Sequence, residues 1–523
     1  MIRRRDILIG GAGAAAAAAF GRRAAGAPAP TTPTGAPAPA VTVPSPAVTV
    51  DVHCHTFCSS DLPIVGFVAH HIPGLTELSR FLTRWPEVVV RALVRAAASL
   101  PNAAGPSAAE ELAWLQAFGD QPGHGEPPGR LIGPVKPLPA AALDTVLGDL
   151  AKRLPFSVSI EQRRILERYL EVLYLVGHGR AAIAASAATL FPSVALYTPA
   201  LVDYDAWSED RAPTPLWQQI RIQEAIARLS TTGRIGRPEA RFHPFVAFDP
   251  RRQLEGPQAA PKPSGAPAPP TAASSALEMV RYAVEAGGFL GVKLYPPVGF
   301  APFDNARLRP QLPFAAGLDG ALDALYAYCE TAEVPILTHA GASNEYALGL
   351  HELVAPARWA PVLERHPTLR LDFGHFGHDY GVASDGSRAG WIYQAAELIE
   401  RYPNVYADLS NSPLVYDAAY ARRLTGLLAD VLARFPKVRR RLMYGSDWWL
   451  SALDPDAGAA VERFRVTLGD LLGPEGLADL MGRNALRFLG LLDDVGRPRP
   501  AGAAARLRAF YGAAPPPAWL SAV

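Results

Sequence analysis

The amino-acid sequence predicts an α/β protein whose parallel strands close into a (β/α)8 (TIM) barrel, with a large helical insertion after the first strand. Three observations predict this fold. Short apolar runs rich in β-branched and aromatic residues alternate with amphipathic helical stretches, as in a parallel sheet covered by helices. There are eight such runs, the number that closes a barrel. No glycine-rich turn follows the first run, so the alternative, a doubly wound open sheet, lacks its usual signature.

The eight expected strands follow one another along most of the chain. They are Val41–Thr56, Val194–Tyr204, Arg241–Phe248, Phe289–Tyr295, Pro335–Ala340, Leu369–Phe376, Asn404–Leu409 and Arg441–Asp447. The helical patterns between the later strands are Ala276–Ala286, Leu318–Ala332, Arg358–Glu364, Gly390–Arg401 and Tyr416–Phe435. Each strand with its following helix supplies one unit of the barrel.

The longest connection lies between the first two strands, over residues 57–190. Helical patterns fill it, notably Ile160–Val176 and Arg180–Leu190. The connection after a barrel strand leaves from the carboxyl-terminal face, where active sites are built. We therefore expect this insertion to form a helical cap over the mouth of the site. A peripheral group of helices is the alternative.

Composition excludes several classes of protein. The chain has 523 residues, of which 49% are hydrophobic and 19% charged, so it can bury a large core. Fifty basic and 49 acidic side chains leave a net charge of +1, which gives no electrostatic reason to expect a nucleic-acid partner or an anionic membrane surface. Three cysteines are too few for a disulfide framework.

The first 45 residues have the features of an export signal. Three arginines, Arg3 to Arg5, precede the apolar run Ile7–Phe20, and small residues follow it. This order is typical of a signal peptide, and the run is too short to span a bilayer comfortably. The arginine-rich start resembles a twin-arginine signal. We expect export to the bacterial periplasm or the extracellular space, with no membrane span after cleavage; an uncleaved Ala-rich tail is the alternative.

The remaining chain divides into a barrel over residues 46–492 and a C-terminal tail over 493–523. Proline supports these boundaries, because 18 of the 51 prolines fall in residues 24–47, 257–270 and 498–518. These three stretches are also rich in small or polar residues. Such a composition is typical of solvated linkers rather than packed elements.

Candidate metal ligands recur at the ends of the expected strands. The first strand ends Asp-Val-His-Cys-His, and its alternation turns His53 and His55 to the same side. Further strands carry or end on Lys293, His339, His375 and Asp447. In a barrel, all six side chains point toward the carboxyl-terminal mouth. Imidazole and carboxylate ligands suit zinc or a similar divalent ion, and three or four of them leave a position open for catalysis.

These motifs resemble the amidohydrolase superfamily, and within it the amidohydrolase-related (amidohydrolase 2) group. The resemblance runs over residues 48–492, leaving the long insertion unmatched. The segments that carry it are Asp51–His55, Gly291–Pro296, Ile336–His339, Phe373–Gly377, Tyr444–Trp448 and Met481–Leu491. The resemblance implies a metal-dependent enzyme in which one or two divalent ions activate water.

Position by position, the resemblance assigns a role to each candidate. His53 and His55 would bind the more buried metal, with Asp447 beside it, and His339 would be a further ligand. His375 would bind a second metal or polarise the substrate as a catalytic group. Lys293 would bridge two metals only if carboxylated, or would bind a substrate anion. We expect one zinc ion, and a second if Lys293 is modified.

The expected function is metal-dependent hydrolysis of an amide, ester or lactone bond in a small molecule. Asp447 would accept the proton of the activated water, and His375 would stabilise the developing oxyanion. One alternative is a non-oxidative decarboxylase, a lyase of the same family, with Arg307 or Arg388 to hold a substrate carboxylate. The other is a non-catalytic, metal-stabilised binding barrel. A homo-oligomer is compatible with the sequence.

Overall fold

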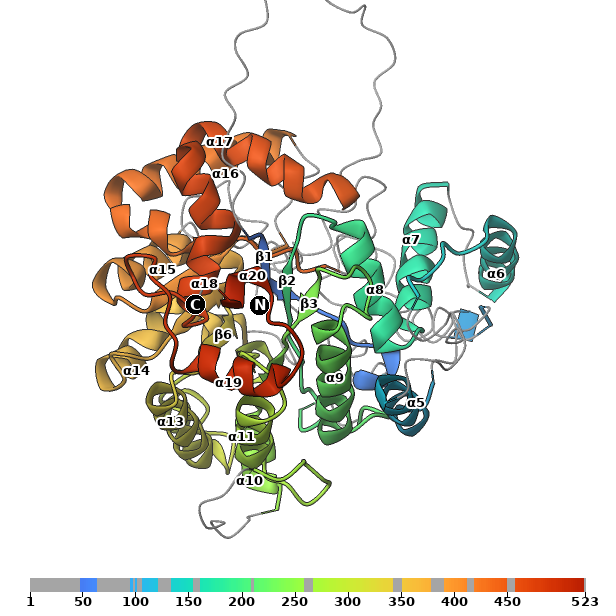
Figure 1. Ribbon diagram of the computed structural model, residues 1–523, viewed down its shortest axis with the longest axis horizontal. Coiled ribbons are helices and arrows are strands. Elements are labelled where there is room, and N and C mark those ends of the chain that lie inside the picture. Colours follow the sequence, from blue (N-terminus) through green and yellow to red (C-terminus); the bar gives the residue numbers. More distant parts are fainter. Residues whose placement is uncertain are drawn as a thin grey trace, which may run out of the picture.

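A computed structural model of the chain describes residues 48–63, 95–96, 99–100, 106–120, 133–153, 160–207, 211–257, 267–341, 350–377, 390–411, 418–448 and 457–521. The export signal expected in residues 1–45 lies outside this range. In the described part, parallel strands form the centre and helices surround them (Figure 1). The α/β class with parallel sheets predicted from the sequence is therefore confirmed.

The strands belong to two parallel sheets. They are β1 (Val50–Cys54), β2 (Leu196–Pro199), β3 (Arg241–Phe242), β4 (Phe245–Ala247), β5 (Gly291–Leu294), β6 (Ile336–His339), β7 (Leu371–Gly374), β8 (Val405–Asp408) and β9 (Leu442–Met443). One sheet has the order β1-β2-β3 and the other the order β4-β5-β6-β7-β8-β9. Every strand pair is parallel, so all carboxyl ends lie on the same side.

The strand expected over Arg241–Phe248 is divided into β3 and β4. Pro244 stands at the break and has no backbone N–H to donate to a neighbouring strand. Before the break β3 pairs with β2, and after it β4 pairs with β5. The predicted single strand is thus two short ones that belong to different sheets.

Backbone hydrogen bonds also connect the two sheets. Val52 N–H donates to Tyr444 O (3.2 Å) and Asp447 N–H donates to His53 O (2.8 Å), which joins β1 to the segment after β9. On the other side, Leu201 N–H donates to Phe245 O (2.9 Å), which joins the segment after β2 to β4. These bonds are isolated and form no continuous ladder, so closure into a barrel stays a prediction.

The helices follow the strands in the order expected. They are α5 (Ala108–Asp120), α6 (Ala140–Arg153), α7 (Ile160–Val176), α8 (Arg180–Leu190), α9 (Leu216–Thr231), α10 (Pro250–Glu255), α11 (Ala276–Glu285), α12 (Asn305–Leu308), α13 (Ala315–Thr331), α14 (Ala360–Arg365), α15 (Gly390–Arg401), α16 (Ala418–Arg434), α17 (Ala460–Ala478), α18 (Asn484–Phe488), α19 (Ala503–Tyr511) and α20 (Ala518–Ser521). Figure 1 shows α9, α11, α13, α14, α15 and α16 following one another around the strands. None of the described helices is long and apolar enough to cross a membrane.

The inserted segment contributes α5 to α8. Helix α5 packs against α9, while α6 and α7 lie furthest from the strands (Figure 1). A fully buried ion-pair cluster fixes this region to the loop after β1, because Arg180 binds both Asp61 and Glu111. Much of residues 57–190 lies outside the described range, so the expected cap over the mouth stays a prediction.

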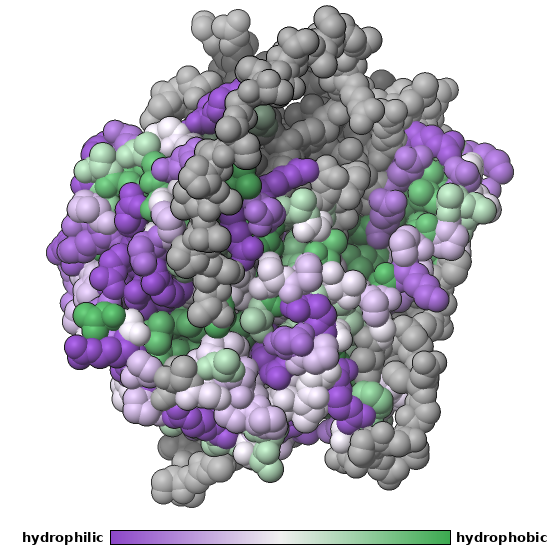
Figure 2. Space-filling view, turned by 45° about the horizontal axis from the view of Figure 1, so that its top comes forward, coloured by the Kyte–Doolittle hydropathy of each residue, from purple (hydrophilic) through white to green (hydrophobic). Residues whose placement is uncertain are grey.

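The C-terminal tail is packed, which corrects the expectation of a solvated segment over residues 498–518. Its helices α19 and α20 bury Leu507, Phe510, Trp519 and Leu520 in a core cluster shared with strand residues such as Phe245. Removing these large apolar side chains from water outweighs the local effect of the prolines between them. Figure 2 shows hydrophilic residues over much of the described surface, with smaller hydrophobic areas among them.

His243 links this tail to the strands. Its ring is fully buried, its Nδ1–H donates to Gly288 O (2.8 Å) and its Nε2 accepts from the Tyr511 hydroxyl (3.1 Å). Burial, together with the charge of Arg241, lowers the pKa of His243 to about 4. The ring is therefore neutral in the folded protein at pH 6, where an unfolded chain already begins to protonate it.

This difference predicts a pH-dependent loss of stability. The unfolded state takes up a proton below pH 6.5 and the folded state does so only near 4, so the free energy of unfolding should fall as pH falls through this window. Denaturant titrations should show an excess loss of about 2–3 kcal/mol in the unsubstituted protein relative to His243→Gln, which cannot titrate. Parallel pH curves for the two proteins would refute the role of His243.

Candidate metal centre

Six side chains singled out from the sequence lie in one buried cluster at the carboxyl ends of the strands. None is more than 8% exposed. They come from β1 and the residue just after it, from β5, from β6, and from the segments following β7 and β9. The six residues are His53, His55, Lys293, His339, His375 and Asp447. Parallel strands bring these distant parts of the chain to the same side of the sheets.

His53 has contacts on both ring nitrogens. Its Nδ1 lies 2.9 Å from Asp408 Oδ2, and since a carboxylate only accepts, Nδ1 carries the proton. Its Nε2 then has a free lone pair, which accepts from Lys293 Nζ at 3.0 Å. The ring is thus fixed in the tautomer that presents Nε2 to the centre of the cluster.

His339 and His375 face each other through nitrogen lone pairs. His339 Nε2 donates to Gly341 O (3.1 Å) and His375 Nδ1 donates to Ser410 O (3.2 Å). The remaining nitrogens, His339 Nδ1 and His375 Nε2, lie only 3.2 Å apart. Two neutral imidazoles in this arrangement repel through their lone pairs unless a proton or a cation lies close to both.

His55 and Asp447 form the other side of the cluster. His55 Nδ1 donates to Ala200 O (2.8 Å), and its Nε2 lies 3.2 Å from Asp447 Oδ1. Asp447 has a left-handed backbone with φ of 48°. The Nε2 atom and the carboxylate oxygen therefore face the same space.

Burial and neighbouring charges determine which side chains of the cluster carry protons. Burial is the main cause that lowers the pKa of His53, to about 3, and of His339 and His375 below the usual histidine value. Burial alone would raise the pKa of Asp447, but the hydrogen bond and charge of His55 outweigh it and hold the pKa below the ordinary aspartate value. At neutral pH the three imidazoles are neutral and Asp447 is ionised.

Burial disfavours the charged form of Lys293 as well. It lowers the pKa of Lys293 to about 8, although Asp408, Asp447 and Asp372 oppose that effect. The amine donates to His53. Sequence reasoning expected Lys293 near the metal ligands, and the structure places it there.

Two residues that sequence reasoning missed organise the cluster. Asp408 accepts from His53 Nδ1, from His375 N–H (3.1 Å) and from Ser410 N–H (2.8 Å). The Ser410 hydroxyl lies 2.9 Å from Nδ1 of both His53 and His375. The available signal was the position of Asp408 at the end of an expected strand, Asn404–Leu409, like that of the histidines.

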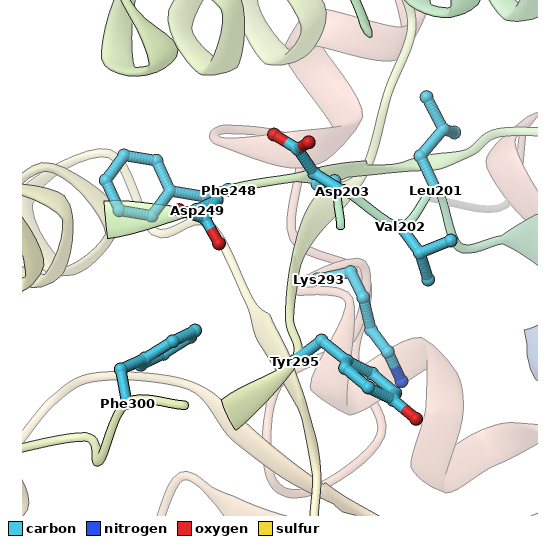
Figure 3. A pocket seen from close by; sticks show the side chains of 9 residues that line it. Leu201, Val202, Asp203, Phe248, Asp249, Lys293, Tyr295 and Phe300 are labelled. Carbon is cyan, nitrogen blue, oxygen red and sulfur yellow. The ribbon is translucent and has the colours of Figure 1, made fainter. Parts of the chain in front are cut away.

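A narrow pocket borders the cluster beside Lys293 (Figure 3). Its lining is mostly apolar and aromatic, and consists of Leu201, Val202, Asp203, Ala247, Phe248, Asp249, Lys293, Tyr295 and Phe300. Lys293 and Tyr295 are two residues apart and share a face of the extended chain. The Tyr295 ring lies against His339, with 4.8 Å between ring centroids. A small organic molecule in this pocket would therefore lie next to the histidines.

The donor set fits a divalent metal ion. Two groups of three residues have ligand atoms within 4.8 Å of one another: His53, His55 and Asp447, and His53, His375 and Asp408. In the second group Asp408 is already engaged by three donors, which is typical of a carboxylate that orients a ligand from behind. The first group offers nitrogen and oxygen atoms of the kinds that zinc prefers, although Lys293 Nζ donates to His53 Nε2 when no ion is bound.

Comparison with protein families agrees with the sequence motifs. Residues 239–491 match the family model Amidohydro_2, described as Amidohydrolase. The match confirms the resemblance to the amidohydrolase superfamily over this range, which includes Lys293, His339, His375 and Asp447 and excludes the segment of His53 and His55. No protein of curated function matches the chain.

Solved structures with some similarity include three bacterial proteins. An amidohydrolase from Burkholderia multivorans with bound zinc is 15% identical, covers 57% of this chain and 84% of its own, and has a TM-score of 0.35. An amidohydrolase from Mycobacterium avium subsp. paratuberculosis is 15% identical over 85% of this chain and 98% of its own (TM-score 0.33). A TIM-barrel protein from Bordetella bronchiseptica is 17% identical over 66% and 90% (TM-score 0.34). Scores of this size are too low to support conclusions about this chain.

The contacts of Asp408 predict the effect of removing its charge. Asp408→Asn keeps the shape but weakens the hold on His53 Nδ1, so the affinity for zinc should fall about 10- to 100-fold. Competition with a chromophoric chelator measures this affinity. Asp470→Asn, at an exposed position on α17, is the control and should bind zinc as the unsubstituted protein does. Equal affinities for all three proteins would contradict the orienting role.

Proposed function

We propose that this protein is a metal-dependent hydrolase that cleaves an amide, ester or lactone bond in a small molecule. The observation that carries the proposal is the convergence of uncommitted nitrogen and oxygen atoms in one buried cluster. His55 Nε2 and Asp447 Oδ1 are 3.2 Å apart, and His339 Nδ1 and His375 Nε2 are also 3.2 Å apart. The lone pairs of His339 and His375 repel each other unless a proton or a cation lies close to both, and the amidohydrolase match over residues 239–491 supports the same reading.

We further propose that the two sheets are parts of one closed (β/α)8 barrel. Two backbone hydrogen bonds support this. The bond from Val52 to Tyr444 joins β1 to the segment after β9, and the bond from Leu201 to Phe245 joins the segment after β2 to β4. Counting β3 and β4 as one interrupted strand gives the eight strands of a barrel. In this arrangement the cluster lies at the carboxyl-terminal face, where barrel enzymes carry their sites.

His53, His55, His339 and Asp447 would hold the ion, with His375 close by. We propose one ion rather than two, since a second would require carboxylation of Lys293. The Lys293 amine donates to His53 Nε2 at 3.0 Å, a bond that an ion on this nitrogen would replace. When bound, a divalent ion supplies Lewis acidity and lowers the pKa of a water molecule from about 15.7 toward 7.

The chain's own residues then account for the proton transfers. The Asp447 carboxylate, ionised by its contact with His55, takes a proton from water and passes it to the leaving group. His375 is held at Nδ1 by Ser410, and it polarises the reacting carbonyl oxygen only when Nε2 also carries a proton, because Nε2 of the neutral ring is an acceptor. The aromatic side chains of Tyr295 and Phe300 border the cluster and would limit the access of water to it.

A decarboxylase of the same family is the alternative that the geometry favours less. Of the two arginines expected to hold a substrate carboxylate, Arg307 is mostly exposed and pairs with Asp304, and Arg388 lies outside the described residues. Release of carbon dioxide from aromatic acids, compared with cleavage of lactones, aryl esters and anilides, distinguishes the two reactions.

Export remains part of the proposal. The leader over residues 1–45 has the arginines and the apolar run of a twin-arginine signal, a route that would allow the metal site to form before export. Fusing these residues to a reporter and following it in cells that lack the twin-arginine translocase tests this. Export that persists without the translocase would argue against it.

The role of Asp447 predicts a separation between metal binding and turnover. Asp447→Asn removes the proton acceptor while keeping an oxygen ligand, so kcat should fall at least about 100-fold with most of the metal retained. Metal analysis and steady-state kinetics, on the best substrate from the lactone, ester and anilide panel, give both quantities. Asp470→Asn is again the control, and full activity of Asp447→Asn would overturn the assignment.

A further inference from the structure

The turn that carries Asp447 has an unfavourable backbone. Asp447 has a φ of 48°, a left-handed conformation that costs a non-glycine residue roughly 1 kcal/mol. The preceding Gly445 packs so closely that a Cβ there would lie 2.9 Å from the Cβ atoms of His53 and Ser410. Something must therefore hold this turn in place against the strands.

Asp51, two residues before His53, keeps this turn in place through hydrogen bonds. Its Oδ1 accepts from Ser446 N–H at 2.9 Å and its Oδ2 accepts from the Ser446 hydroxyl at 2.5 Å. The same hydroxyl oxygen accepts from Trp448 N–H at 3.0 Å. The residues on both sides of Asp447 are thus fixed through one carboxylate, while Asp447 N–H donates to His53 O at 2.8 Å.

The environment of Asp51 makes a purely stabilising role a poor explanation. Its side chain is fully buried and forms no ion pair with any described residue. A buried carboxyl group without a cationic partner is costly, and this one holds both donors of Ser446. Retaining a carboxylate here makes sense if the geometry of the turn matters more than stability.

We propose that Asp51 is a positioning residue that sets the orientation of the Asp447 carboxylate through Ser446. The inference rests on the proposed function, because Asp447 must bind metal or water for its orientation to matter. Asp51 would act through the two donors of Ser446 and, beyond them, the amide of Trp448; its carboxyl group also interacts with the backbone N–H of His53.

A double-mutant cycle tests this. Asp51→Asn and Ser446→Ala should each weaken zinc binding about 10-fold and shift the visible absorption of the cobalt-substituted protein. The double variant should lose about 10-fold rather than about 100-fold, because the two residues act as one unit. Ser446→Thr keeps both donors and should restore zinc affinity to within about twofold of the unsubstituted protein.

Asp51→Glu separates position from charge. It retains the negative charge but lengthens the side chain by one methylene, so it should resemble Asp51→Asn if position matters, and the unsubstituted protein if charge alone does. Should Asp51→Asn fail to fold, the comparison of Ser446→Ala with Ser446→Thr measures the same effect. The inference is overturned if the double variant loses zinc affinity by the product of the two single losses. It is also overturned if the cobalt spectrum is unchanged in both single variants.

These outcomes are distinct from a failure of the proposed function. If the unsubstituted protein binds zinc and hydrolyses a substrate, but the substitutions of Asp51 and Ser446 have independent effects, only the positioning role of Asp51 is refuted. If the unsubstituted protein binds neither zinc nor cobalt, the proposed function is refuted, and the positioning role is refuted with it.

Discussion

Burial of neutral imidazoles against fixed hydrogen-bond acceptors is the constraint on which the site depends. Each ring places a proton on the nitrogen that faces a carbonyl or carboxylate oxygen, because a buried N–H needs an acceptor. Asp408 accepts from His53, Ala200 O from His55, Gly341 O from His339 and Ser410 O from His375. The opposite nitrogens face one small space, together with the Asp447 carboxylate. A chain without these acceptors could hold the same histidines and offer no metal site.

The fold supplies the acceptors as well as the histidines. Parallel strands bring their carboxyl ends to one side, so the residues after β1, β6, β7 and β9 meet even though nearly 400 positions separate the first from the last. The C-terminal helices pack on an apolar cluster that includes the strand residues Val50, Leu196 and Phe245.

Hydrogen bonds to buried aspartates stabilise two turns that have an unfavourable backbone conformation. His375 and Asp447 have positive φ values of 64° and 48° and directly follow β7 and β9 or lie just beyond them. Hydrogen bonds to buried carboxylates compensate at both places: Asp408 accepts from His375 N–H, and Asp51 binds Ser446 next to Asp447. Two buried aspartates thus have equivalent tasks at two ligand-bearing turns.

The sequence by itself determined the α/β class, the positions of seven helices and the six polar side chains of the cluster, because local periodicity and alternation are encoded within short windows. Helices α7, α8 and α15 begin and end where the pattern predicted. Tertiary structure alone decided the rest. Pro244 divides a strand whose residues look continuous, and the proline-rich tail folds because Phe510 and Trp519 find a distant apolar surface. The parts played by Asp51, Asp408 and Ser410 depend on contacts across hundreds of residues, which no local pattern records. The sequence alone does not show whether an aspartate at the end of a strand binds a metal, orients a histidine or stabilises a turn. Only its neighbours in space distinguish these roles.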